Sequence, residues 1–410
     1  MNMSSKALKF FAAGLAALTA IASVVASGPA SAQVSGDVVK IGILNDQSGL
    51  YSDLAGVGSV EAARLAIEEF GGQVLGKKIE LVWADHQNKA DIGAGIARAW
   101  FDKDGVDAIA DFSNSSVGFA VQALANERKK ITLITAASSD FTGKACTPLS
   151  TQWVYNSYSN GYGLARLMTQ RGLDSVYLLT VDYAFGHAFA NDVRKAVTDN
   201  GGKIVGELRF PLNSSDLSSY LLQGQASKAK LIVAASAGSD MTSIVKQATE
   251  FGITPKQALA APSVFLTDVH SMGLQAAQGL QFLTAFYWDR TAASRAWSEK
   301  FFARRKAMPT MTQAGVYSAV RHYLKAIEAA KTDDAAAVAN KMRELPIRDM
   351  NIENGRVRED GQVMHDMYLV EVKKPAESKR AWDYYKVVAT VPAEQAFQPL
   401  GASACPLVKK

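Results

Sequence analysis

Two short polar segments of this chain contain side chains that could bind a small anion. One is Ser113-Asn114-Ser115-Ser116, and the other is Ala136-Ala137-Ser138-Ser139. Hydroxyl groups and the unpaired backbone N–H groups at a helix start both donate hydrogen bonds to anions. Two small polar segments of this kind suggest that the ligand has a carboxylate or another small polar head group.

The sequence around these segments predicts the elements that position them. Residues 107–112 form a short apolar run of strand type, 117–125 have apolar residues on one helical face, and 131–135 return as a buried strand. This order makes a βαβ unit with parallel strands, and ligands bind outside the carboxyl ends of such strands. The alternative is that Ser115 or Ser116 only caps the helix and that both loops are merely solvated.

Length and charge limit the classes of protein that this chain can be. It has 410 residues, enough for two domains, and 48% of them are hydrophobic while 20% are charged. The formal net charge of +5 is too small to indicate nucleic acid or a membrane surface as a partner. We therefore expect a globular protein that binds no nucleic acid.

The first 32 residues read as a secretory signal peptide. Lys6 and Lys9 precede an apolar run over 10–25, and Ala30-Ser31-Ala32 is a small-residue cleavage site. We predict cleavage near Ala32 and a free periplasmic protein. A membrane anchor is the alternative, but the run is short and is followed by Gly28-Pro29.

Cys146 and Cys405 are the two cysteines of the chain. An even pair in an exported protein predicts a disulfide, which would pin the tail, residues 396–410, onto the loop after Ser139. Two buried free thiols are the alternative.

Apolar periodicity predicts two successive β/α series of similar plan, followed by a helical block and an antiparallel hairpin. We expect strands at 38–44, 79–83, 107–112, 131–135, 176–180, 203–208, 231–235, 258–260 and 280–285. A helix capped by Ser59 should end at Gly71, and 153–155 should be extended before a crossover. Helices should fill 293–345, and two hairpin strands should fill 364–372 and 381–390.

No arrangement of residues argues for catalysis. The chain has no Gly-x-Ser-x-Gly elbow and no His-Glu-x-x-His, and its five histidines are isolated. Residues 71–78 superficially resemble a phosphate loop, but they lack Ser or Thr after the lysine and run from a helix into a strand. We expect a protein that is not an enzyme and needs no metal or cofactor.

In its ordered motifs the chain resembles type I periplasmic solute-binding proteins, the leucine/isoleucine/valine-binding relatives that feed ABC importers. The motifs are VKIGIL from Val39, Ser48-Gly49, 113–116 and Asp182-Tyr-Ala-Phe-Gly186. The resemblance implies an α/β fold of two Rossmann-like lobes with parallel central sheets, joined by three crossovers. Lobe 1 would comprise 37–155 plus 286–347, and lobe 2 would comprise 156–285 plus 348–395.

The same resemblance implies which residues bind the ligand. Small polar residues of lobe 1 would hold its carboxylate, and an aromatic wall would come from lobe 2. The polar positions match Asn114, Ser115, Ser116, Ala137, Ser138 and Ser139, and the wall matches Tyr183 or Phe185.

One position departs from the relatives that bind α-amino acids. They place an acid in the stretch that matches 261–264, where this chain has Ser263, and the nearest other acid, Asp240, lies at a predicted helix start. A buried ammonium without a counter-charge is costly, so a carboxylate or a neutral amide with an apolar body is expected.

Aromatic residues near strand ends favour a ring as the apolar body. Tyr51 and Phe265 join Tyr183 and Phe185 as candidate contacts, whereas most of the others, including 286–288, could equally be core or hinge packing. We expect a monomer that delivers a benzoate- or phenylpropenoate-type acid to a membrane permease. The alternatives are a branched-chain amino acid or short amide as ligand, a soluble sensor that presents its ligand to a receptor, and an exported amidase.

Overall fold

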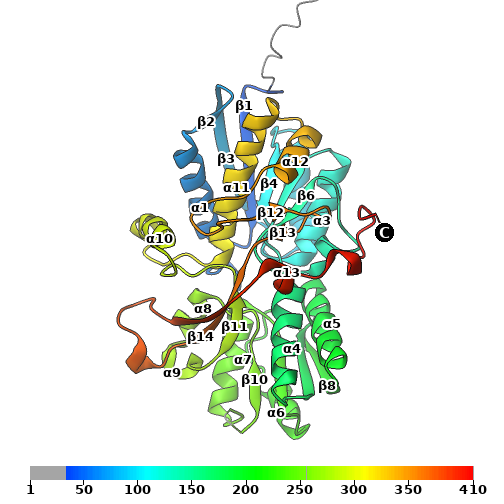
Figure 1. The fold of residues 1–410 in the computed structure, drawn as a ribbon, viewed down its shortest axis with the longest axis vertical. Helices are drawn as coiled ribbons and strands as arrows, with labels where there is room; N and C mark the ends of the chain where they lie inside the picture. Colours follow the sequence, from blue (N-terminus) through cyan, green and yellow to red (C-terminus); the bar gives the residue numbers. More distant parts are fainter. Residues whose placement is uncertain (1–33, 255, 410) are drawn as a thin grey trace, which may run out of the picture. The chain divides into compact units, whose positions relative to one another are not determined.

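A computed structural model describes residues 34–254 and 256–409, which form two α/β lobes, each built on its own parallel sheet (Figure 1). The predicted fold class is therefore confirmed. The predicted signal peptide, residues 1–32, lies outside the described residues. Across the part of the chain that is described, no helix combines the length and apolar character that crossing a membrane requires.

The sheet of lobe 1 has six strands in the order β2-β3-β1-β4-β5-β6. β1 pairs in parallel with β3 and β4, and its residues 41–45 are buried because helices cover both faces of the sheet. The two-residue edge strand β2 runs antiparallel to β3. The strands are β1 Val38–Asn45, β2 Gln73–Val74, β3 Lys77–Asp85, β4 Ala108–Asp111, β5 Ile131–Ile134 and β6 Ser150–Gln152.

Helices α1 (Gly56–Phe70), α2 (Ala90–Asp102) and α3 (Ser115–Glu127) belong to this lobe. One expectation and one alternative about helix starts were wrong. α1 begins at Gly56, so Ser59 lies inside its first turn and is not its cap. α3 is capped by Asn114, whose side-chain oxygen accepts hydrogen bonds from the N–H groups of Ser116 and Val117, so the cap is neither Ser115 nor Ser116.

The sheet of lobe 2 has four parallel strands in the order β10-β9-β7-β8. Their bounds are β7 Ser175–Val181, β8 Lys203–Phe210, β9 Leu231–Ala235 and β10 Ala258–Ala260. The helices of this lobe are η2 Tyr158–Tyr162, α4 Gly163–Gln170, α5 Ala184–Asp199, α6 Ser218–Ala226, α7 Gly238–Glu250, α8 Leu266–Met272 and α9 Leu274–Ala277.

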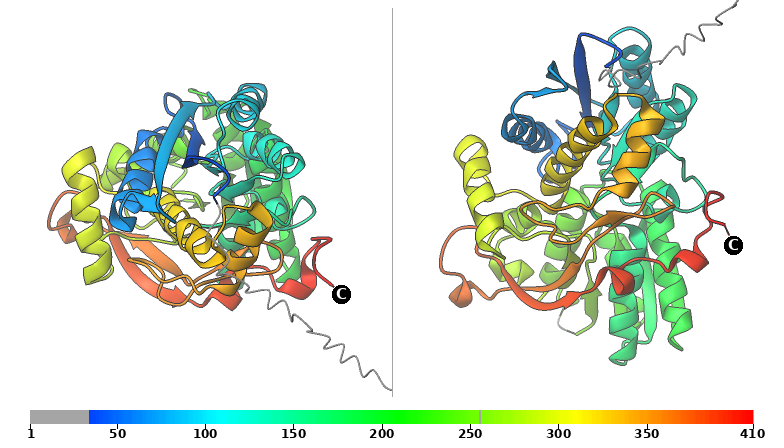
Figure 2. Two further views of the ribbon diagram at one scale, coloured as in Figure 1. Left: turned by 90° about the horizontal axis from the view of Figure 1, so that it is seen from above. Right: turned by 45° about the horizontal axis from the view of Figure 1, so that its top comes forward.

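A third sheet is antiparallel and combines two strands of the C-terminal part of the chain with one earlier strand. β14 (Met367–Val372) pairs with β15 (Tyr385–Val391), as expected for the hairpin, and also with β11 (Gln281–Thr284), which was not expected. Figure 2 shows β14 and β15 (orange to red) leading into the C-terminal tail. The remaining elements are η1 Ser139–Phe141, α10 Ala292–Arg305, α11 Met311–Ala330, α12 Ala335–Glu344, β12 Arg356–Val357, β13 Val363–Met364 and η3 Pro375–Glu377.

Three crossovers, at about 153–157, 285–291 and 345–366, connect the lobes. The first crossover follows β6, which ends where the extended segment 153–155 was expected to begin. Buried amides join the first crossover and the adjoining end of β6 to the third crossover. Asn156 Nδ2 donates to Gln362 Oε1 at 2.7 Å, and Gln152 N donates to Gly361 O at 2.9 Å. These buried hydrogen bonds fix the position of the first crossover relative to the third.

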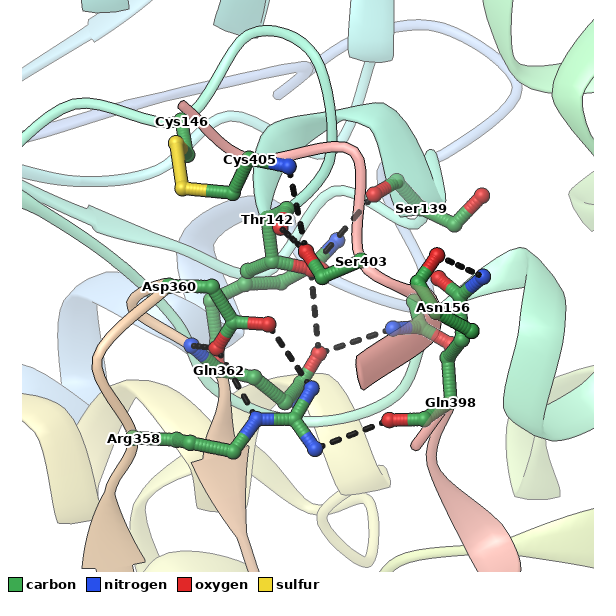
Figure 3. Close-up of polar contacts among 12 residues, drawn as sticks. Ser139, Thr142, Cys146, Asn156, Arg358, Asp360, Gln362, Gln398, Ser403 and Cys405 are labelled. Carbon is green, nitrogen blue, oxygen red and sulfur yellow. Dashed lines mark hydrogen bonds and ion pairs between the residues drawn. A yellow bond between two sulfur atoms is a disulfide. The ribbon is translucent and has the colours of Figure 1, made fainter. Parts of the chain in front are cut away.

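The tail continues from β15 through α13 (Ala393–Ala396) and η4 (Leu400–Ala402) to lobe 1. The predicted disulfide is present: Cys405 is bonded to Cys146, and their Cα atoms lie 5.6 Å apart (Figure 3). Nearby, Ser403 Oγ donates to Thr142 O at 3.2 Å, and Arg358, paired with Asp360, donates to Gln398 O at 2.8 Å. The tail is therefore fastened both to the third crossover and to lobe 1.

Candidate ligand-binding site

The two polar segments of lobe 1 lie side by side, as their positions after neighbouring strands predict. Ser138 N donates to Ser115 Oγ at 3.3 Å, and both side chains are buried. Gln152 supports the second segment by donating to Ala136 O and Ser138 O. The Ser115 oxygen is an acceptor in this contact, and Ser138 Oγ accepts from Asp140 N, so neither hydroxyl hydrogen is donated to another described residue.

The other predicted polar residues are partly or wholly used by the protein itself. The oxygen of Asn114 caps α3, and its amide nitrogen donates to Asn88 Oδ1 at 3.3 Å. Ser116 N donates to that cap, Ala137 O accepts from the N–H of Ser157, and Ser139 Oγ donates to Asp192. The hydroxyls of Ser115, Ser116 and Ser138 are therefore the predicted ones that donate no hydrogen bond to another described residue.

The backbone at the end of β4 has an unusual conformation that could not be predicted from the sequence. Asp111 and Phe112 have φ values of 88° and 69°, a left-handed conformation that is uncommon for residues with a side chain. The buried carboxylate of Asp111 accepts from Asn45 Nδ2 at 2.8 Å and from Thr135 Oγ1, while burial raises its pKa. These contacts hold the turn that leads into Ser113 and Asn114.

Tyr51 reaches from lobe 1 to lobe 2. The carboxylate of Asp46 accepts from the N–H groups of Gly49 and Tyr51, at 2.8 and 2.9 Å, and so fixes the loop after β1. The Tyr51 hydroxyl is hydrogen-bonded to the Tyr183 hydroxyl at 2.6 Å. Both rings are therefore located where the lobes face one another, and burial raises the pKa of each.

Lobe 2 contributes residues that follow β7 and β10. Phe265 precedes α8, its N–H donates to Asp268 Oδ2 at 2.9 Å, and its ring meets the edge of Tyr155 at a centroid distance of 5.9 Å. Ser263 is fully buried, and its hydroxyl has no hydrogen-bond partner among the described residues. An unpaired buried hydroxyl is unfavourable unless a ligand or water satisfies it.

The remaining aromatic residues pack within the protein. Phe185 lies in the first turn of α5 and contacts Phe189 at a centroid distance of 5.3 Å, although Tyr183 is also near it at 5.8 Å. In the second crossover, Phe286 meets the edge of Trp297, and Trp288 Nε1 donates to Trp382 O. Residues 286–288 are thus hinge packing, the alternative considered for them.

Sequence reasoning missed Tyr155 and Asp268, and it gave too little weight to Asp240. All three lie near the aromatic residues Tyr51, Tyr183 and Phe265. Tyr155 is buried, and its burial, together with nearby Tyr183, raises its pKa. Burial raises the pKa of Asp240 to about 6 and that of Asp268 to about 7, and neither acid forms an ion pair among the described residues. Tyr155 follows β6 as Tyr183 follows β7, which is a usable signal, whereas both acids lie in first turns of helices and resemble ordinary caps.

The lobes touch at the start of α7. Gly238 has a φ of 63°, and a Cβ atom added there would lie 2.4 Å from Leu50 O of lobe 1. Ser239 N donates to the same oxygen at 3.4 Å. Glycine is needed here for two reasons, the left-handed backbone and the close approach of the opposite lobe.

Comparison with known proteins agrees with this architecture. Residues 38–379 match the family model described as periplasmic binding protein. The Leu/Ile/Val-binding protein homolog 6 of Brucella melitensis is 26% identical over 333 residues, which cover 78% of this chain and 84% of that protein.

Solved structures show the same fold. A periplasmic binding protein from Burkholderia mallei is 45% identical, with a TM-score of 0.89, over 91% of this chain and 100% of its own. A branched chain amino acid ABC transporter periplasmic ligand-binding protein from Burkholderia xenovorans is 42% identical, with a TM-score of 0.81, over 90% and 100%. A solute-binding protein from R. palustris in complex with benzoate is 18% identical, with a TM-score of 0.79, over 90% and 100%, and shows the fold alone.

These matches confirm that the protein binds small molecules and is not an enzyme. The chain belongs to the periplasmic binding protein family and is a solute-binding protein of an ABC transporter.

Proposed function

We propose that this protein binds a small carboxylate with an aromatic body, of benzoate or phenylpropenoate type, and delivers it to the permease of an ABC importer. The observation that supports the proposal is the pairing of two kinds of surface between the lobes. Ser115 and Ser138 offer hydroxyl donors, while Tyr51, Tyr183 and, beside them, the Tyr155–Phe265 pair offer rings. The first pair suits a carboxylate and the rings suit an aromatic body.

The magnitudes are sufficient for capture without an arginine. Two or three hydrogen bonds to a charged carboxylate contribute about 1.5–3 kcal/mol each. Burial of a ring adds about 2–3 kcal/mol. After the cost of association, a binding free energy near −8 kcal/mol, about micromolar, is attainable.

Ser263 supports a ligand without an ammonium group. Its buried hydroxyl occupies the stretch where amino-acid-binding relatives are expected to have an acid, and it carries no charge. A hydroxyl can accept or donate a hydrogen bond to a polar substituent, but it cannot compensate a buried positive charge.

A branched-chain amino acid is the second candidate, and Asp240 is the observation that favours it. This acid is 2% exposed, has no ion pair among the described residues, and lies close enough to Tyr51 and Tyr183 to raise the pKa of both. An ammonium group placed beside it would gain a buried counter-charge. The 42%-identical Burkholderia xenovorans protein, a branched chain amino acid ABC transporter periplasmic ligand-binding protein, points the same way.

Calorimetric titration of the refolded mature protein separates the two candidates. Benzoate, cinnamate, leucine and valine should be tested against the unsubstituted protein, Asp240→Asn and Ser138→Ala. We expect the aromatic acids to bind, Ser138→Ala to weaken them, and Asp240→Asn to leave them equal or tighter because a nearby negative charge is removed. Leucine binding that Asp240→Asn abolishes would replace the aromatic acid by the amino acid.

Delivery to a permease is the second part of the proposal. The signal peptide predicted at 1–32 would place the mature monomer in the periplasm, where hinge closure presents the loaded form. Uptake of labelled ligand should fall in a strain that lacks the protein. Unimpaired uptake combined with a lost response to the ligand would indicate the soluble sensor instead.

A further inference from the structure

We propose that Asp192 is a positioning residue that latches the two lobes together around bound solute and makes their closure sensitive to pH. Asp192 lies on α5 of lobe 2. Its Oδ2 atom accepts a hydrogen bond from Ser139 Oγ of lobe 1 at 2.9 Å and from Ser157 Oγ of the first crossover at 2.7 Å. One carboxylate oxygen of lobe 2 is thus hydrogen-bonded to both lobe 1 and the first crossover.

The two serines are already fixed on the side of lobe 1. Ser139 N donates to Ser157 Oγ at 3.0 Å, and Ser157 N donates to Ala137 O at 2.6 Å. Asp192 is the partner that arrives with the other lobe. Opening the cleft therefore separates Asp192 from Ser139, while the serine pair can stay intact.

The latch shares a loop with the candidate site. Ser138, proposed to contact the ligand, directly precedes Ser139, and Gln152 holds this loop by donating to Ala136 O and Ser138 O. A ligand that orders this loop also places Ser139 for Asp192, and a closed latch in turn holds Ser138. Binding and closure are then coupled in both directions.

The surroundings determine how the latch responds to protons. Burial is the main cause that raises the pKa of Asp192 to about 6, and Asp140 raises it further, whereas Ser157, Ser139 and Lys195 lower it. Asp140 is itself paired with Lys144 at 2.9 Å, and Tyr158 also lies near Asp192.

The sign of the effect follows from the two states. In an open cleft the carboxyl is hydrated, so its pKa returns toward the ordinary value of 3.8. The proton therefore binds more tightly to the closed form, and closure is favoured as pH falls through about 6 and loses that gain as pH rises through it. Between pH 8 and pH 5 the closed-to-open ratio should rise by up to about tenfold.

Three variants separate the hydrogen bonds from the charge. Asp192→Asn keeps one oxygen that can accept from both serines but cannot titrate. Asp192→Ala removes the acceptor. Asp199→Asn is the matched control, because Asp199 lies on the same helix, loses the same charge, and contacts Lys195 and Tyr162 within lobe 2.

The experiment measures closure without any ligand, so its failure is distinguishable from failure of the proposed ligand class. Small-angle X-ray scattering should be recorded for each protein between pH 5 and pH 8, after melting curves show that it is folded. We expect the radius of gyration to rise with pH in the unsubstituted protein and in Asp199→Asn. It should stay low in Asp192→Asn and stay high in Asp192→Ala at every pH.

Two results would overturn the latch. One is a radius that does not depend on pH in the unsubstituted protein, and the other is a dependence that persists unchanged in Asp192→Asn. If Asp192→Ala fails to fold, Ser139→Ala tests the same contact from lobe 1, and a radius equal to that of the unsubstituted protein at pH 5 contradicts the proposal.

Discussion

Replacing Gly238 by alanine should hinder closure of the cleft. The added Cβ atom would meet Leu50 O at 2.4 Å and the Tyr51 ring at 2.9 Å, both on the opposite lobe. Ordinary Cβ contacts begin at about 3.4 Å, so roughly 1 Å of separation must open between the lobes. In an open protein the two lobes are apart, and the same methyl group meets neither atom.

The size of the effect follows from the contacts that the separation breaks. These are the 2.6 Å hydrogen bond between Tyr51 and Tyr183 and the 3.4 Å bond from Ser239 N to Leu50 O. At about 1 kcal/mol each, their loss totals about 2 kcal/mol. The dissociation constant of the ligand should then rise about thirtyfold.

Gly252→Ala is a matched control for this experiment. Gly252 has the same φ of 63° at the other end of α7, and no atom lies within 4 Å of a Cβ atom placed there. Both variants pay about 1–2 kcal/mol for a left-handed alanine, which a lower melting temperature will report. Only Gly238→Ala should also lose affinity.

Calorimetric titration measures the difference in affinity between Gly238→Ala and Gly252→Ala. The ligand is whichever acid binds the unsubstituted protein. If Gly238→Ala and Gly252→Ala bind equally well, the approach of Leu50 to α7 is not part of the ligand-bound state. The interpretation of Tyr51 and Tyr183 as a pair formed on closure would then be wrong as well.

Three further changes test stability. Cys146→Ser with Cys405→Ser opens a 259-residue loop, so the free energy of unfolding should fall by at most about 5 kcal/mol, and a melting temperature equal to that of the oxidised protein would contradict this. Asn114→Ala removes the cap of α3 and should cost about 1 kcal/mol in urea unfolding, which Asn114→Ser should largely restore. Burial lowers the pKa of His86 from 6.5 to about 4, so stability should fall as pH drops from 6.5 to 4, by at most about 3 kcal/mol, and His86→Gln should lose that slope.

The parallel sheets could be predicted because their signals are local. Buried strands such as β1 and β5 are short apolar runs bounded by polar loops, and a strand, a helix and a strand in succession leave little choice of topology. The pairing of β11 with β14 could not be predicted in the same way. About 85 residues separate these strands, and no local feature of either specifies its partner.

In the candidate site, too, contacts within one sheet could be predicted from the sequence and contacts between the lobes could not. Ser115 and Ser138 were predicted because each follows a strand of one sheet, so the topology alone brings them together. Ser139 follows the same strand, but its partner Asp192 comes from the other lobe. A contact between two lobes depends on the angle between them. No single segment of the sequence determines that angle.

The disulfide also affects how reliably the chain reaches its native state. With two cysteines in the sequence, a single pairing is possible within one molecule, so no scrambled internal isomer can form. Because 259 residues separate Cys146 from Cys405, Cys146 stays a free thiol until the tail reaches it. The competing error is a bond between two molecules, which grows with concentration, so dilution during refolding should favour the correct monomer.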